Sequence, residues 1–190
     1  SSTLAHLASR FGHIGMAVFS VGSQIEAISW MTAGGFSTAL GAYVGQNFGA
    51  KNWFRIIKGY RISLYLAGSV GLVAGLAFIL GGESIFSLFI NEPLTREAGG
   101  MYLFVLGFSQ VFMVAELVTA GAFNGVGRTL PPAILSIAGN ALRIPLAYWL
   151  VTFPALGLTG IWWSLTISSI LKGIVLMLWF WFGVIRHRTA

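Results

Sequence analysis

The stretch ISLYLAGSVGLVAGLAFIL, residues 62–80, runs for nineteen residues without a charged side chain. A helix needs about 20 largely apolar residues to cross the hydrocarbon core of a bilayer, which is about 30 Å thick. Arg61 directly precedes the stretch, and Glu83 is the first charged residue after it. Ile62–Leu80 is therefore predicted to be a membrane-spanning helix.

The composition of the whole chain agrees with this prediction. Of its 190 residues, 56% are hydrophobic and 8% are charged, whereas about 25% charged residues is usual in a soluble domain. So few charged side chains cannot cover a surface that faces water. The chain also has no cysteine, which excludes disulfides and thiolate metal sites. We predict an all-α fold, a polytopic transmembrane helical bundle that forms one domain over residues 1–190.

Four further apolar stretches are long enough to cross the membrane, and they are Ile14–Phe48, Gly99–Asn124, Leu130–Thr152 and Gly160–Ile185. The first would be about 50 Å long as a continuous helix, so we expect either a kink at its glycines or a protruding end. Residues 1–9 are expected to be the last turns of a truncated sixth span. The segment Glu83–Pro93 is too short to cross, and we expect it to lie along the membrane interface.

Basic residues gather on one side of the predicted membrane. That side carries Lys51, Arg55, Lys58, Arg61, Arg128, Arg186 and Arg188, whereas the other side has only Arg10 and Arg96. Cytoplasmic loops are enriched in Lys and Arg, so we expect the first side and the C-terminus to be cytoplasmic in a multi-pass protein of the cell membrane. A net charge of +6 would suggest nucleic acid in a soluble protein, but here no nucleic-acid partner is expected.

Four ionisable residues, Glu26, Glu116, Arg143 and Lys172, lie well inside predicted spans. Each costs a few kcal/mol at that depth, and such residues usually face the interior of a bundle. With a rise of about 1.5 Å per residue, all four can meet near the middle of the membrane. One interpretation pairs Glu26 with Lys172 and Glu116 with Arg143, as ion pairs that only neutralise one another. In the other, one glutamate exchanges a proton or binds Na⁺ during transport.

The helix faces around the two glutamates carry aromatic side chains. Neighbours at spacings of three, four or seven residues are Trp30 for Glu26, and Phe112, Thr119 and Phe123 for Glu116. An acid beside aromatic rings suits a lipophilic organic cation, through charge and cation–π attraction. Ordinary helix packing is the alternative interpretation for the same residues.

Two places in the spans have breaking or polar residues. Pro145 lies inside the span 130–152 and is expected to kink that helix. The same span carries Arg143 and Asn140, and Asn140 is a further candidate for contact with the ion or substrate. Broken helices often line transport cavities, although a kink can be purely structural. Gln46 and Asn47 lie at the cytoplasmic rim of the first span, where they are candidates for a helix cap or for part of a gate.

Motifs for enzymatic chemistry are absent from the sequence. It contains no GxxxxGK[ST] loop for ATP phosphates, no HExxH pair and no GxSxG elbow, and its three histidines are not spaced for a metal. We expect neither an enzyme nor a metal site nor a cofactor.

Two segments resemble the multidrug and toxic compound extrusion (MATE) family. One is GFSTAL at 35–40, followed by VGQNFGAKN at 44–52, which is similar to the second helix of a lobe in that family and its loop. The other is AFNGVGRTLP at 122–131, similar to a junction late in the lobe. The runs RIPL at 143–146 and GLTGIW at 157–162 also fit.

The resemblance implies a protein of twelve helices in two six-helix lobes, which expels a small, cationic, amphiphilic substrate in exchange for H⁺ or Na⁺. This chain would be the C-terminal lobe without most of its first helix, and the missing N-terminal lobe would be its partner within the bilayer. Many relatives have an aspartate in the helix where this chain has Glu116. We expect Glu116 and Glu26 to couple ions or attract cations, with Arg143 and Lys172 as their partners.

Two rival functions stay open. A lipid-linked oligosaccharide flippase of the same superfamily would be favoured by a cationic central groove, whereas the four intramembrane charges sum to zero. A non-transporting scaffold subunit would tolerate joint replacement of those charges by apolar residues.

Overall fold

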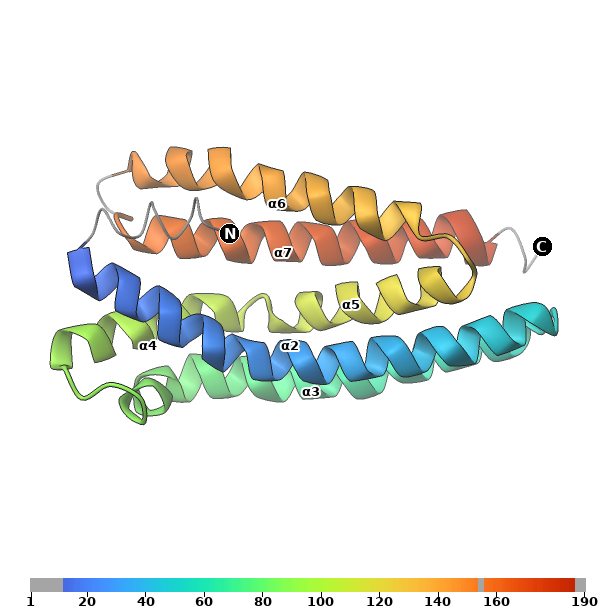
Figure 1. Cartoon of the computed structure of the whole chain (residues 1–190), viewed down its shortest axis with the longest axis horizontal. Helices are drawn as coiled ribbons and strands as arrows, with labels where there is room; N and C mark the ends of the chain where they lie inside the picture. Colours follow the sequence, from blue (N-terminus) through green and yellow to red (C-terminus); the bar gives the residue numbers. More distant parts are fainter. Residues whose placement is uncertain (1–11, 154–155, 187–190) are drawn as a thin grey trace.

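The computed structural model of the chain describes residues 12–153 and 156–186. The expected sixth span at residues 1–9 lies outside this part. The described residues form six α-helices, which are α2 (Gly12–Gly49), α3 (Trp53–Ser87), α4 (Pro93–Gly107), α5 (Gln110–Gly125), α6 (Leu130–Val151) and α7 (Thr159–Phe180), and one π-helical turn, η1 (Trp181–Ile185). The helices run roughly along one long axis, with α6 and α7 side by side (Figure 1). The all-α prediction is confirmed.

The expected spans correspond to helices with different bounds. Three helices, α3, α6 and α7 with η1, are long and apolar enough to cross a membrane, and α4 and α5, which meet at a bend of 52°, would make a fourth if together they form one span. α2 is long enough at 38 residues but does not reach the same apolarity among the described residues. α2 is one continuous helix, so the kink that was expected at its glycines does not interrupt it.

The span predicted over Gly99–Asn124 consists of two helices that meet at a bend. α4 ends at Gly107 and α5 begins at Gln110. Between them, both the backbone N–H and the hydroxyl of Ser109 donate to the Leu106 carbonyl, at 3.0 and 2.9 Å. A serine that bonds back to the preceding turn bends a helix, and this bond accounts for the bend.

The segment Glu83–Pro93, which was expected to lie along the membrane interface, begins as part of a helix. α3 continues through Glu83 to Ser87, and the chain then turns into α4 at Pro93. Gly82 does not end the helix because it packs closely on Gly100 of α4, where a Cβ would lie 2.9 Å from the Gly100 carbonyl oxygen. This contact gives the extra turns of α3 a packing partner.

α2 and α5 approach one another along glycines. A Cβ at Gly121 would collide with the carbonyl oxygen of Ser37, and one at Gly125 would lie 2.6 Å from the Gly41 carbonyl oxygen. The Ser37 hydroxyl crosses the same contact to donate to the Leu117 carbonyl at 2.7 Å. Small residues of this kind let membrane helices pack backbone to backbone.

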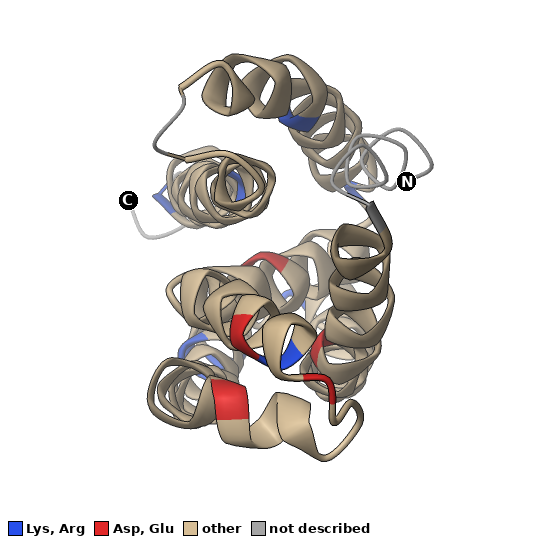
Figure 2. Cartoon of the chain, turned by 90° about the vertical axis from the view of Figure 1, so that its left-hand side faces the viewer, with Lys and Arg blue, Asp and Glu red and all other residues tan. Residues whose placement is uncertain are grey.

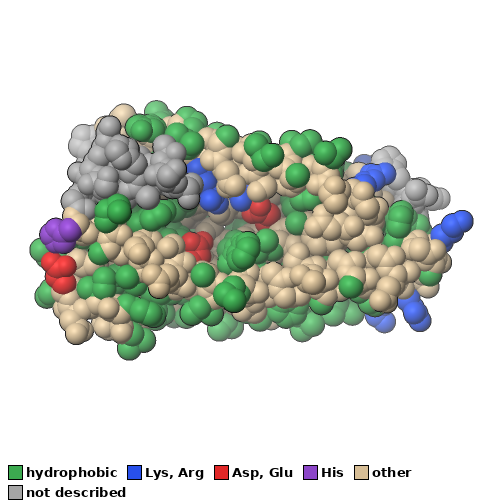
Figure 3. Space-filling view, viewed as in Figure 1, with side chains coloured by type: hydrophobic (Ala, Val, Ile, Leu, Met, Phe, Trp, Pro, Cys, Tyr) green, Lys and Arg blue, Asp and Glu red, His purple; other side chains and the backbone are tan. Residues whose placement is uncertain are grey.

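The two ends of the bundle differ in charge. The α2–α3 turn, the α5–α6 turn and the end of η1 lie at one end, which we call the basic end (Figure 1). Side chains of Lys and Arg project from it, whereas acidic side chains and His13 lie at the opposite, acidic end (Figure 3). The expected grouping of the loops on two sides is therefore confirmed.

The acidic residues are confined to one side of the bundle. All the glutamates lie on α2–α5 or in the loop between α3 and α4, whereas the charged residues within α6 and α7 are Arg143 and Lys172. Viewed along the axis, the red segments lie on the lower group of helices and the upper pair has blue ones only (Figure 2). A cavity between these two groups is therefore lined by both signs of charge.

Candidate functional site

A cavity of about 490 Å³ lies between the two groups of helices, and we call it the central pocket. It is lined by Ser23, Glu26, Ala27 and Trp30 of α2, Met113, Glu116 and Leu117 of α5, Ser136, Asn140 and Arg143 of α6, and Ser169 and Lys172 of α7. In the space-filling view, red and blue side chains are visible in a hollow about midway along the molecule (Figure 3). The structure thus brings all four predicted intramembrane charges to one cavity.

Helix packing accounts for the position of the pocket. α2 packs on α5, α6 packs on α7, and α5 packs on α7. α5 and α7 therefore form the floor, and the pocket opens between α2 and α6. Two apolar clusters lie at either side of it along the axis, one with Phe123 and Phe180 toward the basic end and one with Tyr102 and Trp162 toward the acidic end. The charged groups are enclosed between them.

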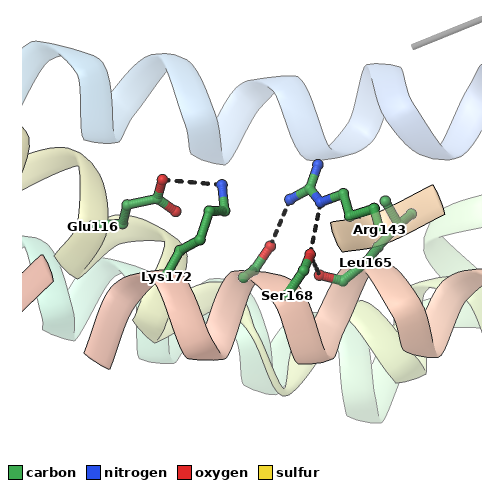
Figure 4. Close-up of polar contacts among 6 residues, drawn as sticks. Glu116, Arg143, Leu165, Ser168 and Lys172 are labelled. Carbon is green, nitrogen blue, oxygen red and sulfur yellow. Dashed lines mark hydrogen bonds and ion pairs between the residues drawn. The ribbon is translucent and has the colours of Figure 1, made fainter. Parts of the chain in front are cut away.

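Lys172 and Glu116 form an ion pair in the floor of the pocket. The Nζ–Oε1 distance is 3.0 Å, and the two side chains are only 9% and 15% exposed. The Lys172 methylenes lie across Gly139 of α6, where any Cβ would collide with them. Gly139 therefore provides the space for the Lys172 side chain. Figure 4 shows the Lys172 ammonium in contact with Glu116.

Arg143 is held by hydroxyl groups of α7. Its Nε donates to Ser168 Oγ at 2.7 Å and its guanidinium NH2 to Ser169 Oγ at 3.0 Å. Ser168 in turn donates to the Leu165 carbonyl at 2.9 Å (Figure 4). These bonds fix the guanidinium on the α6–α7 side of the pocket.

The predicted pairing of Glu116 with Arg143, and of Glu26 with Lys172, is wrong. Glu116 pairs with Lys172 because α5 packs directly on α7, whereas Arg143 of α6 is bonded to serines. Depth along the helices allowed both pairings. The order in which the helices pack decides between them.

Glu26 makes no ion pair within 4 Å among residues 12–153 and 156–186. Its electrostatic neighbours are Arg143, Lys172 and the hydroxyl of Tyr102. The Tyr102 ring packs on Gly22, one turn before Glu26 on α2, in space that only a glycine leaves open. The carboxylate thus faces two cations, neither of which it holds in direct contact.

The other predicted site residues divide into two sets. Trp30 and Asn140 line the central pocket. Phe112, Thr119 and Phe123 lie on other faces of α5 and do not line it. Thr119 bonds to the Tyr60 hydroxyl at 3.0 Å, and the Phe123 ring packs edge to face on Phe180. The packing interpretation describes Thr119 and Phe123, whereas Phe112 lines a different cavity.

The predicted hinge and gate residues also lie outside the pocket lining. Pro145 is inside α6, two residues beyond Arg143. Gln46 is exposed near the end of α2. Asn47 is buried. Its side-chain amide donates to the Tyr43 backbone carbonyl at 2.8 Å, and its backbone carbonyl accepts the N–H of Asn52. Asn47 thereby holds the α2–α3 turn.

Sequence reasoning missed the polar residues that position the charges. Ser168 and Ser169 precede Lys172 by four and three residues, so helical spacing alone places them on its face. Gly139 gave no signal, because many of the 25 glycines serve helix packing. Within the described residues, no three His, Cys, Asp or Glu side chains are placed to hold a metal ion together.

Known proteins match most of the chain. The sequence profile of the MatE family matches residues 2–149. The probable multidrug resistance protein NorM of Thermotoga maritima is 29% identical over 175 residues, which are 90% of this chain and 37% of the relative. Two solved structures of a multidrug resistance MATE family transporter, inward-facing and outward-facing, superpose with TM-scores of 0.89 and 0.90 at 22% and 23% identity. They cover 98% and 99% of this chain, which spans 43% and 42% of theirs.

Proposed function

The chain belongs to the MatE family, and on this premise we propose that it forms the C-terminal lobe of a transporter that expels small molecules in exchange for H⁺ or Na⁺. The observation that carries the proposal is the central pocket, in which four ionisable side chains line one cavity inside an apolar bundle. Intramembrane charges that face a cavity are typical of ion and substrate pathways. The relatives are named as multidrug resistance proteins, and the chain spans about two fifths of their length.

The Lys172–Glu116 pair is proposed to be the exchange point for cations. The Lys172 ammonium occupies the position beside Glu116 that a transported cation would take. A cation that binds Glu116 must therefore displace Lys172, whose electrostatic neighbours also include Glu26. Moving toward Glu26 would give the released ammonium a second carboxylate, so that neither charge is left unpaired in the pocket.

The cargo is proposed to be a lipophilic organic cation. Trp30 borders the same pocket as Glu26 and Glu116, and its side chain is 55% exposed in this chain. An indole face beside carboxylates attracts a cation by charge and by cation–π interaction. The two carboxylates and two bases sum to zero, which distinguishes this pocket from the cationic groove expected of an oligosaccharide flippase.

Alternating access is proposed to occur by movement of whole lobes. The chain matches the inward-facing and the outward-facing structure with nearly equal TM-scores, 0.89 and 0.90. Equal similarity to both supports a lobe that keeps its internal shape while its position against the other lobe changes. The basic end is proposed to face the cytoplasm, as the enrichment of Lys and Arg predicts.

Lys172→Gln in the full-length polypeptide tests the displacement step. Without the ammonium, a cation reaches Glu116 without competition, so we expect purified protein to bind ethidium at least about tenfold more tightly, or about 1.4 kcal/mol. Binding is measured by ethidium fluorescence in detergent. Arg143→Gln is the matched control because it removes one positive charge from the same pocket without vacating Glu116. Equal gains in the two variants would refute displacement and leave only an effect of net charge.

Competition between ions and ethidium tests the proposed function itself. If Glu116 is shared between cargo and coupling ion, raising either the proton or the Na⁺ concentration should weaken ethidium binding to the native protein. The Glu116→Gln variant should lose this competition. Ethidium binding that neither ion affects would argue against antiport at this site.

A further inference from the structure

A second cavity lies at the basic end, between the last turns of α2 and the first turns of α3. Its volume is about 670 Å³, and we call it the basic groove. Phe36 and Leu40 of α2 and Ile62 of α3 line its apolar part. Arg55 and Lys58 of α3 line its outer part. The groove therefore has an apolar length and a cationic mouth.

The two basic side chains have no acidic counterpart at this end of the molecule. The chain has only five acidic residues. Glu26 and Glu116 line the central pocket, and Glu83, Glu92 and Glu97 lie at the acidic end. Within the described residues neither Arg55 nor Lys58 forms an ion pair, whereas the neighbouring Arg61 lies over the Trp181 ring at 5.5 Å. The positive charge at the mouth of the groove therefore suits an anion from outside the chain.

The walls of the groove are built by close packing. The Tyr43 ring rests on Gly59, where any side chain would collide with it. This contact brings the aromatic ring beside the start of α3, close to the two bases. The positive end of the α3 helix dipole points to the same region and adds to the attraction for an anion.

We propose that the basic groove binds an anionic phospholipid. The phosphodiester would lie between Arg55 and Lys58, and part of an acyl chain would lie along the apolar part. From Arg55 to Ile62 the groove follows α3 for about 10 Å, and there it enters the apolar stretch that crosses the bilayer. Basic pockets between helices at a membrane surface are suited to anionic headgroups. A free phosphate would use the bases alone and leave the apolar length unfilled.

The test uses the full-length polypeptide in a neutral detergent and native mass spectrometry with added lipid. We expect phosphatidylglycerol to bind more tightly than phosphatidylcholine. In the double variant Arg55→Gln/Lys58→Gln, phosphatidylglycerol affinity should fall about 25-fold, at about fivefold for each basic residue, and the preference over phosphatidylcholine should be largely lost.

The matched control is Lys51→Asn/Arg128→Gln. It removes two charges from the same end but outside the groove, and Asn tolerates the positive φ of 56° at position 51. We expect this variant to keep the lipid preference. Three results would overturn the proposal: no preference in the native protein, an equal loss in the control, or glycerol phosphate competing as well as the intact lipid.

Discussion

Glu116→Gln is expected to abolish gradient-driven efflux by the full-length protein, with a fall in rate of at least about 100-fold, or about 2.7 kcal/mol. Glu116 is the carboxylate in contact with the Lys172 ammonium at 3.0 Å, so it is the proposed position for the exchanged cation. Efflux is measured as ethidium release from proteoliposomes under an imposed H⁺ or Na⁺ gradient. Glu97→Gln, an exposed glutamate at the acidic end, is the control and should transport normally.

The same variant is expected to lose stability, which must be separated from loss of transport. Removing one partner of a buried ion pair costs up to about 3–5 kcal/mol, and the nearby Glu26 carboxylate would offset part of this cost. The double variant Glu116→Gln/Lys172→Gln removes both charges, so it should recover most of the thermal stability but not the coupled efflux. If the double variant exports ethidium with normal ion coupling, Glu116 is not the coupling residue.

Gly121→Val is expected to destabilise the fold by disrupting helix packing. A Cβ at this position would collide with the Ser37 carbonyl and separate α2 from α5. Overpacking costs about 1–3 kcal/mol, and the lost bond from Ser37 to Leu117 adds about 1 kcal/mol. We expect a fall of several degrees in the Tm of the purified protein in detergent, measured by tryptophan fluorescence.

Gly68→Val provides the comparison for this substitution. Gly68 also lies within a helix, but a Cβ there has no atom within 4 Å. Both variants make the same change in intrinsic helix propensity, so the difference between them reports the α2–α5 contact. Equal Tm values for the two variants would show that this contact does not hold the lobe together.

The fold was predictable from the sequence because a bilayer imposes a simple length rule. Residues 62–80 have no charge, and they lie within a helix as expected. The ends were less predictable, because they depend on contacts between helices. α3 gains its last turns from the packing of Gly82 on Gly100, and the bend between α4 and α5 depends on one serine hydroxyl at position 109.

The residues that form the site were more predictable than the pairs that they make with one another. The cost of charge in lipid forces Glu26, Glu116, Arg143 and Lys172 to face inward, and all four line one cavity. Their pairing depends on which helices touch, and the helical rise does not contain that information. Gly139 is the clearest example, because its role appears only once the Lys172 side chain is seen to cross it.

The aromatic neighbours show a second limit of helical spacing. Thr119 and Phe123 lie three and seven residues after Glu116, yet they turn toward Tyr60 and Phe180 in the apolar cluster. Spacing places residues on broadly one face of a helix, but a face about 100° wide is shared here between a core and a cavity. Only the positions of the neighbouring helices determine which part of this face packs in the core and which part lines the cavity.

The most direct test of the proposed function is ethidium efflux from proteoliposomes that contain the native full-length polypeptide, with and without an opposing H⁺ or Na⁺ gradient. We predict that ethidium moves against its own gradient when one of the two ion gradients is imposed, and that a protonophore or an Na⁺ ionophore stops it. Folded protein that moves no ethidium under either gradient, or that only equilibrates it, would contradict coupled antiport.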